Sequence, residues 1–261
     1  MDKVEAKIKT MFASIPKNPT PGLRPIYPVQ DNAEPIISIV KDAEARMTRI
    51  ELEYKHDKLP KEVKLSMQGY GMGAVNNLIS AMIGYRFEEI TQQADAPFVG
   101  AYAAYGELVK SKDAFQMLAI PKEGKEAEGL NALLLEAEKI KRFGFTNSEL
   151  ERAKTDLLKN LEKQYNERDN QKNNSLVEEY VQHFLNQEAI PGIEWEYQTV
   201  QAMLPQLKLD IVNQMAKSYV TDSNLIVSFM APDKPAVKIP TKEQILAAID
   251  ASKKAQPSVL S

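Results

Sequence analysis

Residues 97–120 read PFVGAYAAYGELVKSKDAFQMLAI, and this stretch decides the fold class. Two runs rich in aromatic and aliphatic residues, 98–108 and 114–120, have the composition of β-strands. The polar segment 109–113 between them has the length of a hairpin loop, so the two strands are expected to pair antiparallel. A sheet built on this hairpin needs further elements to cover its apolar face, and the flanking sequence indicates which they are.

Three further strands are predicted outside this hairpin. They are residues 36–40, residues 49–54 and residues 224–230. The first and the last are short apolar runs, whereas the second alternates strictly between polar and apolar residues. Successive side chains of a strand point to opposite faces, so Ile50, Leu52 and Tyr54 should face a helical layer.

Helical spacing of apolar residues predicts one long helix over residues 61–93. Gly69, Gly71 and Gly73 weaken its first part, and a bend, a break or a close helix contact is expected there. After the hairpin the chain is helical almost throughout. The apolar stripes cover residues 130–140, 150–165, 176–184 and 211–219, and a closing helix follows over residues 241–251.

Capping boxes mark two of these helix starts. Thr146 and Glu149 have the spacing at which each side chain accepts a hydrogen bond from the other's backbone N–H, and Thr241 and Gln244 repeat it. Gly144 ends the preceding helix, where a residue with positive φ is often required. We expect both boxes to be structural caps and not parts of a site.

The order of these elements determines the predicted fold class. Strands, a long helix, a hairpin, several helices and a last strand do not alternate one by one, which argues against a doubly wound parallel sheet. We predict an α+β two-layer sandwich, with helices packed on one face of a mostly antiparallel sheet of about five or six strands.

The N-terminal region divides the chain into three parts. Residues 1–15 carry Val4, Ile8 and Phe12 at helical spacing, and residues 16–35 contain six prolines, which do not suit a helix or a central strand. The helix alone cannot bury its apolar side. We therefore expect residues 1–15 to be the terminal helix of a preceding, missing domain, residues 16–35 to be a Pro-rich linker and residues 36–261 to be a single α+β domain.

Composition excludes several classes of function. The 261 residues include 33 lysines and arginines and 36 aspartates and glutamates, for a formal net charge of -3, and no basic run is present. Nucleic acid and anionic membrane surfaces are therefore not expected partners. The absence of cysteine removes disulfides, thiolate zinc sites and cysteine nucleophiles. We find no apolar stretch of membrane-spanning length and no signal-peptide core, and we expect a soluble chain of undetermined compartment.

The two histidines do not form a metal motif. His56 and His183 lie far apart in the sequence, without the spacing that places two ligands on one helix. We expect His56 to lie at a solvated strand end and His183 to be a satisfied helical histidine. We expect no catalytic, cofactor-binding or metal-binding residue in this chain.

Other motifs that carry chemistry elsewhere have simpler explanations here. Glu88-Glu89 and Glu178-Glu179 are adjacent on predicted helices, so their carboxylates diverge and are expected to be solvated. The glycines between positions 69 and 73 lack the full dinucleotide-binding pattern and lie within a helix. The methionines at 67, 72 and 82 have helical spacing and are expected to fill the core.

Three segments resemble the non-catalytic domains of pitrilysin/insulinase-family zinc metallopeptidases. They are NNLIS at 76–80 with RFEEI at 86–90, DAPF at 95–98, and GFTNSELERAK at 144–154. The helix at residues 4–15 also resembles the last helix of the domain that normally precedes this one. The resemblance covers nearly the whole chain.

The resemblance implies a clamshell of four related α+β domains in two halves around a peptide-cleaving chamber. The family's catalytic motif is His-x-x-Glu-His with a downstream Glu, in which the histidines and the distal Glu bind zinc and the central Glu acts as a base. Neither histidine of this chain matches it. The other half carries an Arg and a Tyr near the region that corresponds to 117–130, and this chain has neither residue there.

By elimination within the family, the chain looks most like the second domain of the catalytic half. It would then be a non-catalytic, chamber-forming and peptide-positioning domain, with the remaining domains and the peptide substrate as partners and with zinc in the missing catalytic domain. A bacterial parent would place it in the periplasm or cell envelope. The alternatives are a catalytically silent homologue that acts as a structural or processing-core subunit, and a generic helical binding domain, against which the lack of a repeat argues.

Overall fold

A computed structural model describes residues 2–20, 22–23 and 25–257. Its sheet contains β1 (Ile36–Asp42), β2 (Arg49–Asp57), β3 (Phe98–Val109), β4 (Lys112–Pro121) and β5 (Leu225–Pro232). The strand order is β1-β5-β2-β4-β3, and every neighbouring pair is antiparallel except the parallel pair of β1 and β5. The predicted α+β class with a mostly antiparallel sheet is confirmed.

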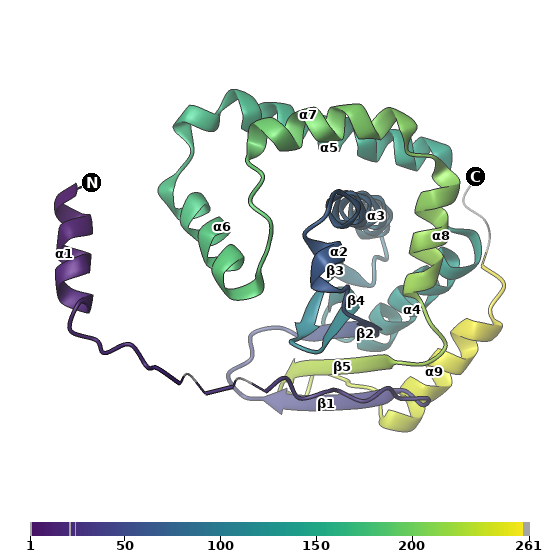
Figure 1. The fold of residues 1–261 in the computed structure, drawn as a ribbon. Coiled ribbons are helices and arrows are strands. Elements are labelled where there is room, and N and C mark those ends of the chain that lie inside the picture. The colour runs from purple at the N-terminus through teal and green to yellow at the C-terminus, as the bar shows by residue number, and fades with distance from the viewer. Residues whose placement is uncertain (1, 21, 24, 258–261) are drawn as a thin grey trace.

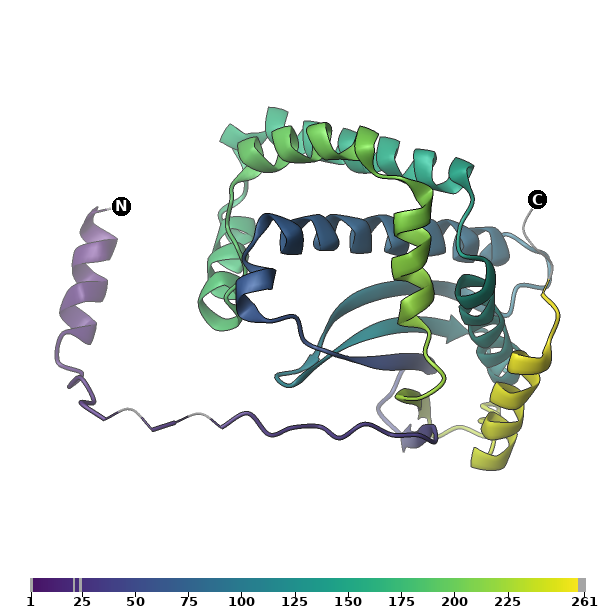
Figure 2. The ribbon, with the colours of Figure 1, turned by 45° about the vertical axis from the view of Figure 1, so that its right-hand side comes forward.

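Helices cover one face of this sheet (Figure 1). The helices that follow α1 in the chain are α2 (Lys61–Lys64), α3 (Met67–Thr91), α4 (Glu126–Phe143), α5 (Asn147–Asn166), α6 (Asn173–Asn186), α7 (Ile193–Met203), α8 (Leu209–Tyr219) and α9 (Lys242–Lys254), with the short 3-10 helices η1 (Arg168–Asn170) and η2 (Leu204–Gln206). Helix α3 packs on β3 and α4 packs on β4 and β2, while α5 and α7 pair with each other beyond α3. Figure 2 shows α3 running across the sheet beneath this outer pair.

The core lies between the sheet and its helices. Ile50 and Leu52 are fully buried and Tyr54 is 4% exposed, whereas Arg49 on the same strand is exposed. The predicted orientation of β2 is therefore confirmed. Phe98, Phe115 and Phe229 extend the same apolar face onto the neighbouring strands.

The long helix predicted over residues 61–93 is present as α3, and the break that was expected in its first part separates it from α2, which ends at Lys64, while α3 begins at Met67. The break lies before the glycines: Ser66 accepts a hydrogen bond from the Gly69 N–H at 3.3 Å and caps α3. Gly69 makes the predicted close contact, since a Cβ there would lie 2.3 Å from the Val63 carbonyl oxygen.

Two other expectations about local structure need correction. The hairpin loop is a turn of only Lys110 and Ser111, because β3 continues to Val109 and β4 begins at Lys112. Helix α7 was not predicted at all. Of the methionines expected in the core, Met82 is fully buried but Met67 is 60% exposed, since it lies in the first turn of α3 beyond the edge of the sheet.

Both predicted capping boxes are confirmed. Thr146 precedes α5 and Thr241 precedes α9, and in each box the reciprocal side-chain and backbone hydrogen bonds are present. Gly144 has a φ of 74°, and a Cβ at this position would lie 2.4 Å from Asn213 Oδ1. Glycine is therefore required there on both conformational and steric grounds.

The N-terminal helix α1 (Asp2–Phe12) stands apart from the domain (Figure 1). None of its residues is buried, and Val4, Ile8, Met11 and Phe12 are each at least 51% exposed. The chain after α1 is extended and joins the domain at Val29, whose N–H donates to Ser111 Oγ at 3.2 Å. The small number of contacts expected for this helix is confirmed, and its assignment to a preceding domain stays a prediction.

Candidate functional site

A cavity of about 470 Å³ opens at the hairpin end of the sheet. Its lining comes from the hairpin ends of β3 and β4, from α2 and the loop before it, from the first half of α3, from α5 and α7, and from the segment that joins α6 to α7. The polar groups that line it are Lys58, Lys64, Tyr70, Asn76, Asn77, Tyr105, Glu107, Asp113, Glu188 and Glu196. Concave sites with a few convergent polar groups are where ligands usually bind.

Aromatic rings form the inner wall of the cavity. Tyr105 stacks on Tyr219 with ring centroids 4.6 Å apart, and Tyr219 donates a hydrogen bond from its hydroxyl to Asn76. Burial raises the pKa of Tyr105 to about 12, so this hydroxyl stays protonated at neutral pH. Both rings are held by these contacts and by the stacking of Tyr219 on Phe115, with ring centroids 5.5 Å apart.

His56 belongs to this aromatic cluster and not to a solvated strand end, so that expectation is wrong. Its Nε2 lies 3.0 Å from the Tyr219 carbonyl oxygen, and its ring lies 5.6 Å from that of Tyr105. Burial lowers the pKa of His56, although the Tyr219 carbonyl opposes the shift. The strand end is covered because the C-terminal end of α8 folds over it.

Two ion pairs lie in the lining of the cavity. Lys58 pairs with Glu107, and Lys64 Nζ lies 2.6 Å from Glu188 Oε1. Lys64 also donates to the Asn186 carbonyl oxygen at 3.3 Å, and Lys110 Nζ donates to Asn186 Oδ1 at 2.5 Å. These contacts tie the end of α6 to α2 and to the hairpin turn.

Two carboxyl groups in the lining are weakly compensated. Burial raises the pKa of Glu196, and the nearby Glu179 raises it further. Burial also raises the pKa of Asp113, against the attraction of Lys58, whose Nζ is 3.9 Å away. These groups could bind a polar or cationic group, but no histidine or nucleophile of the lining pairs with them for acid-base chemistry.

The histidines do not fit a zinc site. His56 contacts the Tyr219 carbonyl oxygen, and His183 Nδ1 lies 2.6 Å from the Glu188 carbonyl oxygen, so His183 is the satisfied helical residue that was predicted. Within the described ranges, no group of three or more His, Cys, Asp or Glu side chains is placed to hold a metal ion.

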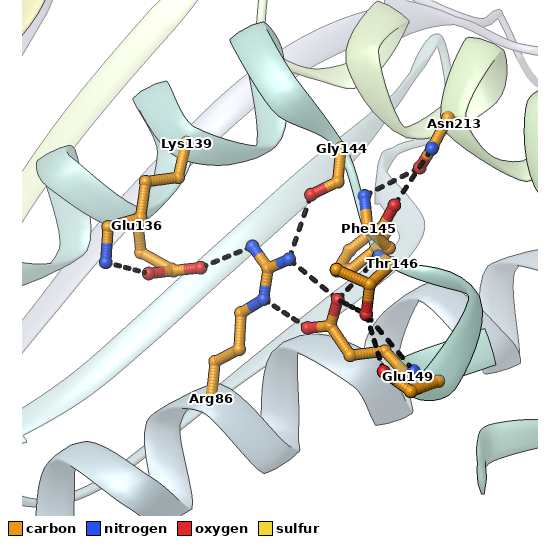
Figure 3. Close-up of polar contacts among 9 residues, drawn as sticks. Arg86, Glu136, Lys139, Gly144, Phe145, Thr146, Glu149 and Asn213 are labelled. Atoms are coloured by element: carbon orange, nitrogen blue, oxygen red, sulfur yellow. Dashed lines mark hydrogen bonds and ion pairs between the residues drawn. The ribbon is translucent and has the colours of Figure 1, made fainter. Parts of the chain in front are cut away.

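A second polar cluster is centred on Arg86 and joins three helices (Figure 3). Arg86 projects from α3, donates to Glu136 Oε1 of α4 at 2.8 Å and to the Gly144 carbonyl oxygen at 2.9 Å, and binds Glu149 of α5 through two nitrogens. Its guanidinium also lies 4.6 Å from the centre of the Phe145 ring. The Arg86 guanidinium therefore links α3 to α4, to the segment after α4 and to α5.

The Arg86 cluster is connected to the cap at Thr146 through Glu149. Burial alone would raise the pKa of Glu149, but the hydrogen bonds from Arg86 and from the Thr146 N–H outweigh it and hold the pKa below its ordinary value. Glu149 therefore caps α5 and also neutralises Arg86. The cap was predicted, but its connection to Arg86 was not, although an arginine among the apolar positions of a helix was a visible signal.

Comparison with known proteins places this geometry in context. No family model matches the chain. A protein from Arabidopsis thaliana named zinc protease PQQL-like is 24% identical over 229 residues, which are 88% of this chain and 21% of that protein. The periplasmic protease PqqL from Escherichia coli superposes on the entire chain with a TM-score of 0.80 and 17% identity, over 28% of its own length.

Separate domains of such proteins have also been solved. The first half of PqqL matches the entire chain with a TM-score of 0.77 and 17% identity, over 55% of that half. A peptidase M16 inactive domain from Pseudomonas fluorescens matches 91% of the chain, over 52% of its own length, with a TM-score of 0.57 and 16% identity. The chain has the fold of a pitrilysin/insulinase-type peptidase domain.

The chain spans only part of the length of the proteins that it matches. It spans about a fifth of the Arabidopsis protein and 28% of PqqL. The match to the Arabidopsis protein named zinc protease PQQL-like is a match of sequence and not only of fold. Across the described part of the chain, no helix is long and apolar enough to cross a membrane.

Sequence reasoning missed the cavity because its walls come from distant segments. Helix α7 supplies Glu196 and Val200, and β3 supplies Tyr105. The Trp195 ring, at 4.8 Å from that of Tyr70, anchors α7 to α3. The available signal for this helix was the i, i+4, i+7 spacing of Ile193, Tyr197 and Val200.

Proposed function

We propose that this domain is a non-catalytic, chamber-forming and peptide-positioning domain of a pitrilysin/insulinase-like zinc metallopeptidase. The observation that carries the proposal is the match of the entire chain to one half of PqqL, together with a sequence that lacks His-x-x-Glu-His. The domain would be the second of the catalytic half, and the zinc, the general base and the remaining domains would belong to the rest of the parent protein.

The cavity indicates what such a domain can contribute. Its aromatic wall offers flat apolar surface, and Glu196 and Asp113 offer acceptors for the N–H groups of a peptide or for a basic side chain. A wall of this kind holds a chain segment and keeps water away from it, and it moves no proton itself. The domain would act by orientation and exclusion.

A silent homologue is the second candidate function. The similarity to a solved inactive peptidase domain favours it, because that domain has a comparable fold. In this case the parent would bind a partner chain as a structural or processing-core subunit and would cleave nothing. The two candidates differ in the rest of the parent and not in this domain.

One experiment tests the proposal on two proteins. The purified chain should contain no stoichiometric zinc after dialysis and should not hydrolyse an unstructured peptide, because its histidines are apart and already hydrogen-bonded. The full parent should contain zinc and show hydrolysis that a chelator stops. A parent without either property would favour the silent homologue, and zinc lost from the isolated chain on replacing His56 or His183 would overturn the non-catalytic assignment.

A further inference from the structure

Helix α6 presents an apolar surface that nothing in the described chain covers. Its exposed side chains follow the i, i+3, i+4, i+7, i+8 spacing of one helix face: they are Val177, Tyr180, Val181, Phe184 and Leu185, which are 56%, 59%, 40%, 84% and 58% exposed. We call these five residues the α6 face. No residue of α6 is buried, although an amphipathic helix usually packs its apolar face against a neighbour.

Polar contacts hold the C-terminal end of α6 against the domain. Asn186 accepts hydrogen bonds from Lys64 and Lys110, and Lys64 also pairs with Glu188 just beyond the helix. These polar contacts position α6 beside the hairpin turn but leave its apolar side unused. The helix is therefore placed by the domain without contributing to the core.

The N-terminal segment leaves the domain at the same place. Val29 binds Ser111 of the hairpin turn, and Lys110, the other residue of that turn, binds Asn186 at the end of α6. The 16 residues from 13 to 28, between the end of α1 and Val29, can span at most about 55 Å when fully extended. Whatever α1 belongs to is thus tethered close to α6, and both views show α1 and α6 on the same side of the domain (Figures 1 and 2).

Helix α1 has an unused apolar side of its own. Val4, Ile8, Met11 and Phe12 are all exposed, so α1 is incomplete without a partner. The chain matches 55% of the first half of PqqL, so the remaining length of that half is enough for about one more domain. The apolar sides of α1 and α6 are both exposed, and a short segment connects α1 to the hairpin turn beside α6. One neighbouring domain could therefore cover both helices.

We propose that the α6 face is the docking surface for the preceding domain of the same parent protein, the domain that α1 completes. This inference rests on the proposed function only in that such a domain exists, and it holds equally for an active and a silent parent. The partner must present an apolar surface, since the α6 face contains one hydroxyl and no charge. Docking would fix the orientation of the cavity relative to that domain, because Lys64 lines the cavity and also binds Asn186 at the end of α6.

The chain contains no cysteine, which makes thiol labelling a direct test. Phe184→Cys places a thiol on the α6 face, and Ser175→Cys places one on the opposite, polar side of the same helix, where residue 175 is also exposed. Each variant is made in this chain alone and in the full parent, and labelling at the new thiol is followed by peptide mapping. Neither site is buried here, so neither replacement should unfold the chain.

Docking should slow labelling of Phe184→Cys in the parent by at least about tenfold relative to this chain, because a packed thiol reacts only when the interface opens. Ser175→Cys should react at the same rate in both proteins. Equal rates for Phe184→Cys in the two proteins would overturn the proposal. Two other results would also overturn it. Protection that appears only when an unstructured peptide is added would make the α6 face a peptide site. Protection that grows with the concentration of the isolated chain would indicate that a second copy covers the face. Zinc content and peptide cleavage of the parent are measured separately, so failure of docking and failure of the proposed function give different results.

Discussion

Replacing Arg86 with methionine should destabilise the domain strongly without changing its surface. Arg86 is 6% exposed and Glu136 is 2% exposed, and their nitrogen and oxygen atoms are 2.8 Å apart. Arg86→Met keeps most of the side-chain volume next to Phe145 but removes the positive charge, so Glu136 and Glu149 lose their shared partner.

The size of the effect follows from what the two carboxylates retain. Removing one partner of a buried ion pair costs about 3–5 kcal/mol, mainly because the other charge stays buried. Glu136 keeps Lys139 at 3.3 Å, and Glu149 keeps the Thr146 N–H at 2.7 Å. We therefore expect a loss of about 3 kcal/mol, near the lower limit of that range. At roughly 2–4 °C per kcal/mol for a domain of this size, the midpoint of thermal unfolding should fall by about 6–12 °C.

Urea unfolding at neutral pH, followed by circular dichroism, measures the change in free energy. Arg46→Met is the matched control, because Arg46 is exposed, and it should change stability by less than about 0.5 kcal/mol. A loss below about 1 kcal/mol for Arg86→Met, as expected for a surface ion pair, would refute the reasoning that the buried Arg86 cluster contributes strongly to the free energy of unfolding.

The pH dependence gives an independent check on the cause. In the native chain the pKa of Glu149 is lowered, so its stabilising contribution is present above the ordinary carboxyl pKa and is lost as the pH falls through the lowered value. In Arg86→Met the effect of burial on the pKa of Glu149 is no longer offset by Arg86, so the pKa in the folded state should rise. Protonation of Glu149 at low pH should then remove part of the loss of stability in the variant. The difference between variant and native chain should therefore shrink as the pH falls to about 4.

Three other changes have defined outcomes. Thr146→Ala removes the cap of α5 and should cost about 0.5–2 kcal/mol in urea unfolding, and an unchanged midpoint would mean that the box contributes nothing. Gly69→Ala should destabilise because its Cβ would meet the Val63 carbonyl oxygen, whereas Gly73→Ala, with open space around it, should stabilise by up to about 1 kcal/mol; equal effects would contradict the close contact. The pKa of Glu196 is raised, so ionisation of this carboxyl group destabilises the fold as the pH rises through the raised pKa. Glu196→Gln should therefore raise the midpoint of thermal unfolding at neutral pH but not near pH 4. A gain that persists near pH 4 would show that the charge of Glu196 is not the cause.

Most of the secondary structure could be predicted from the sequence because the deciding forces are local. Alternation along β2 correctly identified the buried residues Ile50, Leu52 and Tyr54, since a strand turns successive side chains to opposite faces. The caps at Thr146 and Thr241 need only residues three positions apart. The family resemblance likewise rested on short segments whose order and spacing are visible in one chain.

The parts that failed depend on groups that lie far apart in the sequence. His56 looked solvated because its neighbours along β2 are charged, but Tyr219, 163 positions later, covers it. The stripe on α6 looked like any core helix, and only the fold shows that no described element packs against it. Local periodicity reports that a face is apolar and does not report what covers it.

The sequence by itself determined the fold class, the direction in which β2 faces, the two capped helices and the resemblance to a peptidase family. The tertiary structure decided the cavity, the exposure of the α6 face and the role of Arg86, whose partners Glu136 and Glu149 are 50 and 63 positions away. The division has one physical cause. Backbone geometry and capping act within one or two turns of the chain, whereas burial, ion pairing and cavity shape depend on which surfaces meet after the helices have packed on the sheet.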